Sequence, residues 1–170
     1  MLKETKDKAE ALLDSGKAVE AVAMLTEELC CVENDADEFA VRIWRFNAIC
    51  AMGDLLGGSE DAAWLLEHMD VAYEALENFT AEKESVFRQE LYLVLGRKSV
   101  SEKNYDKGIE YFNQVLELNS HNAEAYQGRG ACYYAMGQME SAKQDLLSYY
   151  ENNPLAAAEL TGRFHAEGRE

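Results

Sequence analysis

Residues 123–156 read AEAYQGRGACYYAMGQMESAKQDLLSYYENNPLA, and the preceding 34 residues, 89–122, read QELYLVLGRKSVSEKNYDKGIEYFNQVLELNSHN. A shift of 34 residues brings together five pairs of residues, most of them of similar size: Tyr92 and Tyr126, Gly96 and Gly130, Tyr105 and Met139, Gly108 and Ala142, Phe112 and Leu146. A fixed period of this length is typical of a solenoid built from helical hairpins. Because solenoids present extended surfaces, the repeat predicts binding rather than catalysis.

Outside the two copies, the apolar residues also recur at spacings of three and four, which predicts helices. The single proline, Pro154, favours the same reading, since proline breaks helices. No stretch alternates with a period of two for long enough to predict a strand. The expected helices span about 2–15, 18–31, 38–52, 60–78, 81–101, 105–118, 123–136, 139–152 and 155–165.

The charge of the chain is strongly acidic, with 16 basic and 32 acidic residues and a formal net charge of −16. Phosphate backbones and anionic lipid surfaces repel such a chain, so we expect neither nucleic acid nor a membrane as a partner. Net charge first of all favours solubility. A sharper hypothesis is a preference for partners with basic segments, because acidic residues are dense at 33–38 and 60–90.

Four cysteines, Cys30, Cys31, Cys50 and Cys132, form no Cys-x-x-Cys motif, and the three histidines lie far apart in the sequence. A metal site needs convergent ligands, so we expect no metal and no cofactor. Reduced, buried cysteines behave as small hydrophobic residues. The N-terminus lacks the apolar core of a signal peptide, and no stretch approaches the roughly 20 apolar residues of a membrane span. These features predict a cytoplasmic protein.

The two copies resemble tetratricopeptide repeats, a family of 34-residue helix-turn-helix units. Small residues fall where paired helices of that family approach closely, and aromatic residues fall between the hairpins. The residues that carry the resemblance are Tyr126, Gly130, Tyr133, Gly137, Ala142, Leu146 and Pro154 in one copy, and Tyr92, Leu95, Gly96, Tyr105, Gly108 and Phe112 in the other. Some positions depart from the family pattern, notably Arg129 in place of leucine and Tyr149 in place of alanine.

The resemblance implies an all-α fold, a right-handed superhelical solenoid of about four antiparallel helix hairpins followed by a C-terminal capping helix. We expect one domain over residues 1–170. Its parts are a repeat at 2–35, a divergent elongated hairpin at 36–79, clear repeats at 89–122 and 123–156, and the capping helix at 155–165.

In the family, alternate positions of each first helix line a concave groove that receives peptides or helices. The matching positions here are Glu90, Leu93, Arg97, Val100, Glu124, Gln127, Ala131 and Tyr134. This mixture of charged and apolar side chains suits a peptide with both kinds of anchor. The alternative interpretation is that Leu93 and Val100 pack against neighbouring helices and that the charges are only solvated.

No catalytic residues are expected, because the chain contains neither a phosphate-binding Gly-rich loop nor a nucleophile motif. The nearest constellation is His68, Asp70 and Glu74, which we interpret as a solvated helix surface. The leading hypothesis is a non-enzymatic scaffold that binds a peptide or helix of a partner protein. Two alternatives stay open, namely an acidic chaperone for a secreted or unstable client and a self-assembly module that forms a homodimer. In the self-assembly case, the segment with Leu155, Leu160 and Phe164 covers a neighbouring subunit instead of Tyr149 and Tyr150.

Overall fold

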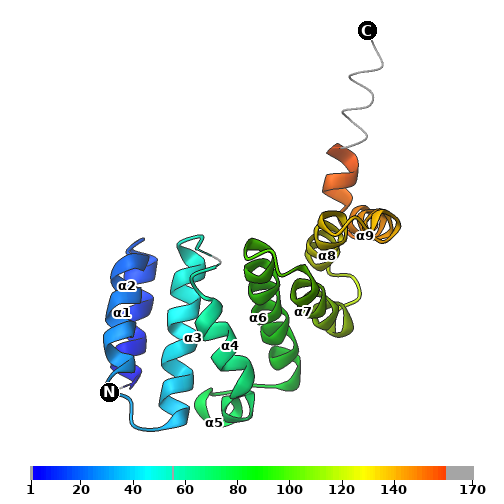
Figure 1. Cartoon of the computed structure of the whole chain (residues 1–170). Coiled ribbons are helices and arrows are strands. Elements are labelled where there is room, and N and C mark those ends of the chain that lie inside the picture. Colours follow the sequence, from blue (N-terminus) through cyan, green and yellow to red (C-terminus); the bar gives the residue numbers. More distant parts are fainter. Residues whose placement is uncertain (1, 55, 160–170) are drawn as a thin grey trace. The chain divides into compact units, whose positions relative to one another are not determined.

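The computed structural model describes residues 2–54 and 56–159, and within those ranges it contains helices and no strand (Figure 1). The helical elements are α1 (Leu2–Asp14), α2 (Ala18–Leu29), α3 (Asp35–Ala51), α4 (Ser59–Glu67), the 3₁₀ turn η1 (Met69–Val71), α5 (Ala72–Ala75), α6 (Ala81–Ser101), α7 (Tyr105–Leu118), α8 (Ala123–Ala135) and α9 (Met139–Glu151). A short helical segment, 154–159, follows α9. The predicted all-α class is confirmed. None of the described helices is long and apolar enough to cross a membrane.

The chain divides into two compact units, Met1–Leu95 and Gly96–Glu170, and the boundary falls inside α6. The first unit has 8 basic and 21 acidic residues, a formal charge of −13. The second has 8 basic and 11 acidic residues, a formal charge of −3. Of the net charge of −16, −13 therefore belongs to the first unit.

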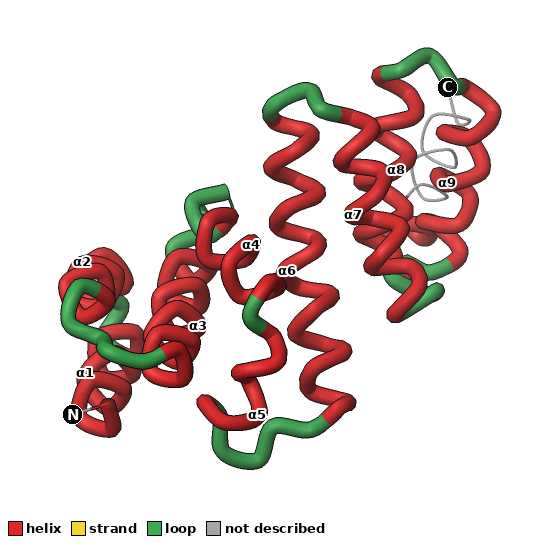
Figure 2. Tube along the Cα trace, turned by 60° about the horizontal axis from the view of Figure 1, so that its bottom comes forward, coloured by secondary structure: helices red, strands yellow, loops and turns green. Residues whose placement is uncertain are grey.

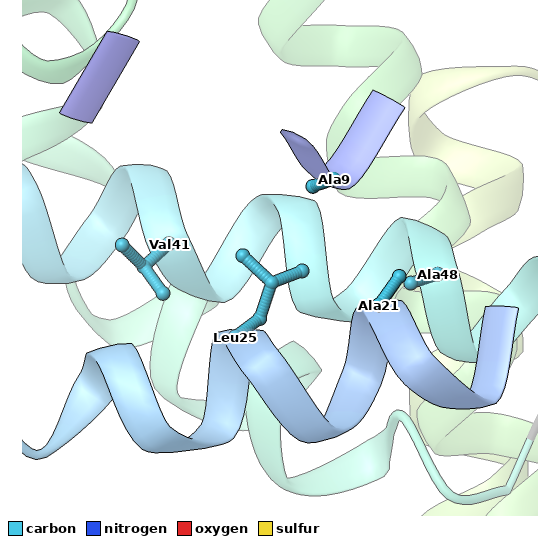
Figure 3. Packing of buried hydrophobic residues seen from close by; sticks show 5 residues of the cluster. All are labelled: Ala9, Ala21, Leu25, Val41 and Ala48. Carbon is cyan, nitrogen blue, oxygen red and sulfur yellow. The ribbon is translucent and has the colours of Figure 1, made fainter. Parts of the chain in front are cut away.

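Small residues hold the first three helices of the first unit together (Figure 3). The buried cluster consists of Ala9 of α1, Ala21 and Leu25 of α2, and Val41 and Ala48 of α3. Three of these five residues are alanines, which let helix backbones approach closely, while Leu25 fills the space between them. Burial of this apolar stripe supplies most of the stability of such short helices.

The predicted continuous helix over 60–78 is wrong, because the structure divides that stretch into α4, η1 and α5 (Figure 2). The break occurs at His68, whose backbone leaves the helical region. The His68 ring stacks on the Trp64 ring with centroids 3.8 Å apart, and its Nδ1 lies 2.8 Å from the Trp64 carbonyl oxygen. The apolar stripe of this stretch is nevertheless buried as expected, with Ala62, Leu65, Met69 and Ala72 in the core.

The helix expected from residue 38 begins three residues earlier, at Asp35. Asn34 acts as its N-cap, because the backbone N–H of Asp37 donates a 2.9 Å hydrogen bond to Asn34 Oδ1. Asp35, Asp37 and Glu38 then place negative charge in the first helical turn, where the helix dipole favours it. Residues 35–37, which lie outside the expected helix, thus belong to its first turn.

Asparagine side chains cap two successive helices of the second unit. Asn104 caps α7 and Asn122 caps α8, each through its side-chain oxygen and the backbone N–H three residues later. Gly137 separates α8 from α9 with a φ of +75°, a conformation that favours glycine. Of the expected capping helix, residues 155–159 are helical, and its remainder, 160–165, lies outside the described residues.

Candidate functional site

The eight predicted groove residues lie on two helices. Glu90 and Leu93 belong to the part of α6 in the first unit, whereas Arg97 and Val100 lie in its last turns, within the second unit. Four further residues lie on α8, namely Glu124, Gln127, Ala131 and Tyr134. Six of the eight predicted residues therefore belong to the second unit.

Four of these six residues line one hollow of about 620 Å³, the inner hollow. It is lined by Arg97, Phe112, Ala123, Glu124, Gln127, Gly128, Ala131, Tyr149 and Asn153. Arg97 of α6 forms an ion pair with Glu124 of α8, so the two charged residues on its wall neutralise each other. Both side chains are partly exposed, which leaves them accessible to charged groups of a ligand.

Phe112 of α7 contributes an aromatic group to the inner hollow and is almost fully buried, at 1% exposure. Glycines on both neighbouring helices make room for its ring. A Cβ on Gly96 would lie 2.7 Å from Phe112 Cε1, and a Cβ on Gly128 would overlap the same ring. The two glycines thus explain how α6 and α8 both approach α7 closely.

A second cavity, the terminal cavity, has a volume of about 420 Å³ and lies between α8 and α9. Its lining residues are Tyr126, Gln127, Gly130, Ala131, Tyr134, Met139, Ala142, Lys143 and Leu146. Gln127 and Ala131 line both hollows, and Tyr134 lines only this one. Large apolar side chains are exposed here, with Tyr134 at 68% and Leu146 at 51%.

Val100 lines neither of the two hollows. Its Cγ2 would lie 3.5 Å from a Cβ on Gly108, so the side chain packs close to α7. For Val100, the packing interpretation therefore fits the geometry better than the groove interpretation. In the second unit, the other five predicted residues line at least one hollow.

Sequence reasoning missed Tyr149 and Asn153, which come from α9 and the residues after it. Asn153 Nδ2 donates a 3.2 Å hydrogen bond to the Tyr149 hydroxyl. The family pattern draws attention to first helices and so passes over second-helix residues. The signal that could have identified Tyr149 is its bulk at a position where the family commonly has alanine.

The unusual Arg129 of α8 is explained by a buried carboxylate on α9. Arg129 Nε donates to Asp145 Oδ2 at 2.8 Å, and Nη2 donates to Asp145 Oδ1 at 2.7 Å. Its Nη1 donates to Asn113 Oδ1 of α7 at 2.6 Å. One guanidinium group of α8 thus forms hydrogen bonds with both α7 and α9. The hydrogen bond from Arg129 to Asp145 raises the pKa of the guanidinium.

No group of three or more His, Cys, Asp or Glu residues that could hold a metal ion occurs within residues 2–54 and 56–159. Burial raises the pKa of the Cys132 thiol to about 11, so this cysteine stays protonated at neutral pH and is a poor nucleophile. What the inner hollow offers is shape, an aromatic floor and paired charges, a combination suited to holding a ligand segment.

Comparison with known proteins places the repeats in a family. Residues 99–160 match a family model described as "Tetratricopeptide repeat". Sperm-associated antigen 1 of Rattus norvegicus is 40% identical over 50 residues, which are 29% of this chain and 6% of that protein. The lipoprotein NlpI homolog of Haemophilus influenzae is 34% identical over 61 residues, which are 36% of this chain and 19% of that protein. The chain thus covers only a small part of both relatives.

Solved structures resemble the chain over most of its length. YrrB, a TPR protein with an unusual peptide-binding site, superposes with a TM-score of 0.65 at 14% identity, covering 96% of this chain and 74% of YrrB. A tetratricopeptide repeat protein from Parabacteroides merdae superposes with a TM-score of 0.63 at 17% identity, covering 91% of this chain and 54% of that chain. Such low identities establish the fold alone. Residues 99–160 are therefore tetratricopeptide repeats, and the chain has the helical-hairpin solenoid fold of that family.

Proposed function

We propose that this chain is a non-enzymatic interaction module that holds a peptide or helix of a partner protein in the inner hollow. The observation that carries the proposal is the convergence of Arg97, Glu124, Gln127 and Ala131 on one hollow of about 620 Å³. These residues come from α6 and α8, the first helices of the two copies that the 34-residue shift superposes. The tetratricopeptide match of residues 99–160 and the peptide-binding site of the structurally similar YrrB support the same function.

The walls of the inner hollow suit a segment with both polar and apolar groups. Ala131 and the ring of the partly exposed Tyr149 offer apolar contacts, whereas Gln127, Asn153 and the Arg97–Glu124 pair offer hydrogen-bond donors and acceptors. A charged side chain of the partner could exchange with one member of the ion pair, since both members are partly exposed. Contacts of this kind recognise extended peptides and single helices alike.

We further propose that the partner carries basic segments. The first unit has a formal charge of −13, and like-signed surfaces of this kind attract and steer oppositely charged partners. Binding should then weaken as salt is raised, because the Debye length shortens to about 8 Å at physiological ionic strength. An acidic partner would be repelled by the same field.

The test uses three pools of dye-labelled 12-residue peptides, one basic, one neutral and one acidic, with binding followed by fluorescence anisotropy. We expect the basic pool to bind the full chain and to lose at least about tenfold in affinity in Ala131→Trp, a change of about 1.4 kcal/mol. Tryptophan at this exposed helical position fills the inner hollow.

Gln144→Trp is the matched control, because Gln144 is exposed on α9 and does not line the inner hollow. Equal binding by the wild type and by Ala131→Trp would exclude the inner hollow as the site. Equal binding of all three pools, with the Ala131→Trp effect intact, would leave the site in place but reject the basic preference.

A further inference from the structure

Another cavity, the α1–α5 cavity, lies in the first unit and has a volume of about 440 Å³. Its lining comes from the start of α1, the first half of α3 and the end of α5, and includes Lys3, Lys6, Ala40, Trp44 and Ala75. Figure 1 shows these three parts of the first unit at the same end of its helices. Cavities of roughly 300–1,000 Å³ are typical of sites for small ligands.

The break at His68 brings α5 to this cavity. The His68 backbone leaves the helical region and a 3₁₀ turn follows, so α5 turns away from the direction of α4 (Figure 1). One continuous helix over 60–78 would carry Ala75 and Leu76 along the direction of α4 instead. The α1–α5 cavity is therefore a product of the irregular hairpin and has no counterpart in the two clear repeats.

The walls of the α1–α5 cavity are largely apolar. Ala40 is 2% exposed, and Leu2, Trp44 and Leu76 are half-buried. Trp44 supplies the largest apolar side chain, and the neighbouring Ala40 and Ala75 are small. An aromatic ring or a short alkyl chain suits such walls, because apolar surface gains free energy when it leaves water and aromatic rings pack well on indole.

The two lysines that line the cavity are the least satisfied cations of the first unit. Lys6 Nζ lies 3.8 Å from Glu10 Oε1, and Lys3 has no ion pair within residues 2–54 and 56–159. Each of the other six basic side chains of this unit has an oxygen partner within 3.4 Å, namely Lys8, Lys17, Arg42, Arg45, Lys83 and Arg88. Because Lys3 and Lys6 are about one helical turn apart, a single anion can contact both.

Two carboxylates limit the charge that the ligand can carry. Asp7 and Glu77 are exposed and line the same cavity. They repel additional negative charge, so a single carboxylate is favoured over a polyanion. We propose that the α1–α5 cavity binds a small monocarboxylate with an apolar body, whose carboxylate pairs with Lys3 and Lys6 and whose apolar group lies on Trp44. This site goes beyond the peptide-binding function proposed for the inner hollow and does not depend on it.

Isothermal titration calorimetry of the full chain tests the site with three probes: 4-phenylbutyrate, its neutral analogue 4-phenylbutanamide, and acetate. We expect 4-phenylbutyrate to bind at least about tenfold tighter than the amide, because hydrogen bonds to a charged acceptor are the stronger ones. Acetate lacks the apolar body and should bind at least about tenfold more weakly than 4-phenylbutyrate.

The double variant Lys3→Gln, Lys6→Gln should abolish the preference for 4-phenylbutyrate over the amide. Both lysines are exposed, so the substitutions leave the core intact. Lys8→Gln is the matched control, because Lys8 is exposed on α1, pairs with Glu4 and does not line the cavity. We expect this control to bind all three probes as the wild type does.

No saturable binding of 4-phenylbutyrate at millimolar concentration, or equal affinity for the acid and the amide, would overturn the proposal. An equal loss of affinity in Lys8→Gln would reduce the effect to overall charge and would also overturn it. A loss in Ala131→Trp would assign the carboxylate to the inner hollow. A peptide with a free C-terminal phenylalanine that binds at least about tenfold tighter than 4-phenylbutyrate would overturn the assignment to a small acid in favour of a chain terminus.

Discussion

The hairpin of α3 and α4 and the hairpin of α8 and α9 are built around the same ion pair, although only the second follows the repeat pattern clearly. In each, an arginine of the first helix binds an aspartate sixteen residues later with two parallel hydrogen bonds. Arg45 donates to Asp61 at 2.8 and 2.6 Å, and Arg129 donates to Asp145 at 2.8 and 2.7 Å. Both aspartates are almost fully buried.

The two hairpins differ in where they place the small residue that lets the helices meet. In the regular hairpin, Gly130 of α8 faces the backbone of Ala142 on α9. In the irregular one, Phe46 of α3 faces Gly58 at the same twelve-residue spacing, so a large residue stands where the regular hairpin has Gly130. The arginine–aspartate pair thus tolerates different packing around it, which indicates that the pair, rather than the glycine pattern, is what these hairpins share.

Breaking the pair should have the largest effect, and the effect should be greater in α3–α4. Asp61→Ala leaves Arg42 and Arg45 without their buried acceptor, which should lower the free energy of unfolding by about 3–5 kcal/mol. Asp145→Ala removes the buried carboxylate from one arginine, whereas Asp61→Ala removes it from two, so a smaller loss of stability is expected. Urea unfolding of both variants measures the difference. A greater loss at Asp145 would contradict the comparison.

Replacing Gly58 with alanine should have an intermediate effect on the stability of the α3–α4 hairpin. A Cβ on Gly58 would lie 3.0 Å from Phe46 Cδ2, so Gly58→Ala forces the buried ring to move and should cost about 1–3 kcal/mol of overpacking. Adding Phe46→Leu to Gly58→Ala should recover part of this loss by giving the new methyl group room. Thermal unfolding compares the single and double variants. If the double variant were no more stable than the single one, Gly58 and Phe46 would not be the packing pair inferred here.

Thiol reactivity gives the smallest and most local comparison of the two hairpins. Each first helix carries one cysteine, Cys50 in α3, which is partly exposed, and Cys132 in α8, which is buried. Because burial raises the pKa of Cys132 to about 11, its thiolate is scarce below that pH. A thiol reagent at pH 8 should therefore label Cys50 while sparing Cys132, as peptide mapping would show.

The raised pKa of Cys132 also makes the stability of the protein depend on pH. The folded pKa lies above the ordinary value of 9.0, so the native state holds the proton more tightly than the unfolded state does. Stability from this group is complete below pH 9 and is lost as pH rises towards 11. Cys132→Ala should remove that part of the alkaline destabilisation.

In the labelling experiment at pH 8, rapid reaction of native Cys132 would contradict the expected protection and would show that α8 opens locally.

The candidate site was predicted in part. Because the 34-residue shift aligns first helices, it identified Arg97, Glu124, Gln127 and Ala131, which do line one hollow. It could not identify Tyr149 or Asn153, since residues of the second helix reach the hollow only through the crossing of α9 with α8. Val100 fits the periodicity equally well, yet close packing beside Gly108 separates it from the others.

By itself, the sequence determined the all-α class and the helices of the clear repeats, because helical periodicity is a local signal. Only tertiary structure decided the break at His68, the partner of Arg129 and the exposure of Leu146. Each of these depends on residues brought together by packing. The Trp64 ring, on which His68 stacks, packs beside Phe39 and Arg42 of α3. A buried carboxylate binds Arg129, and the Leu146 side chain stays exposed where no described helix covers it.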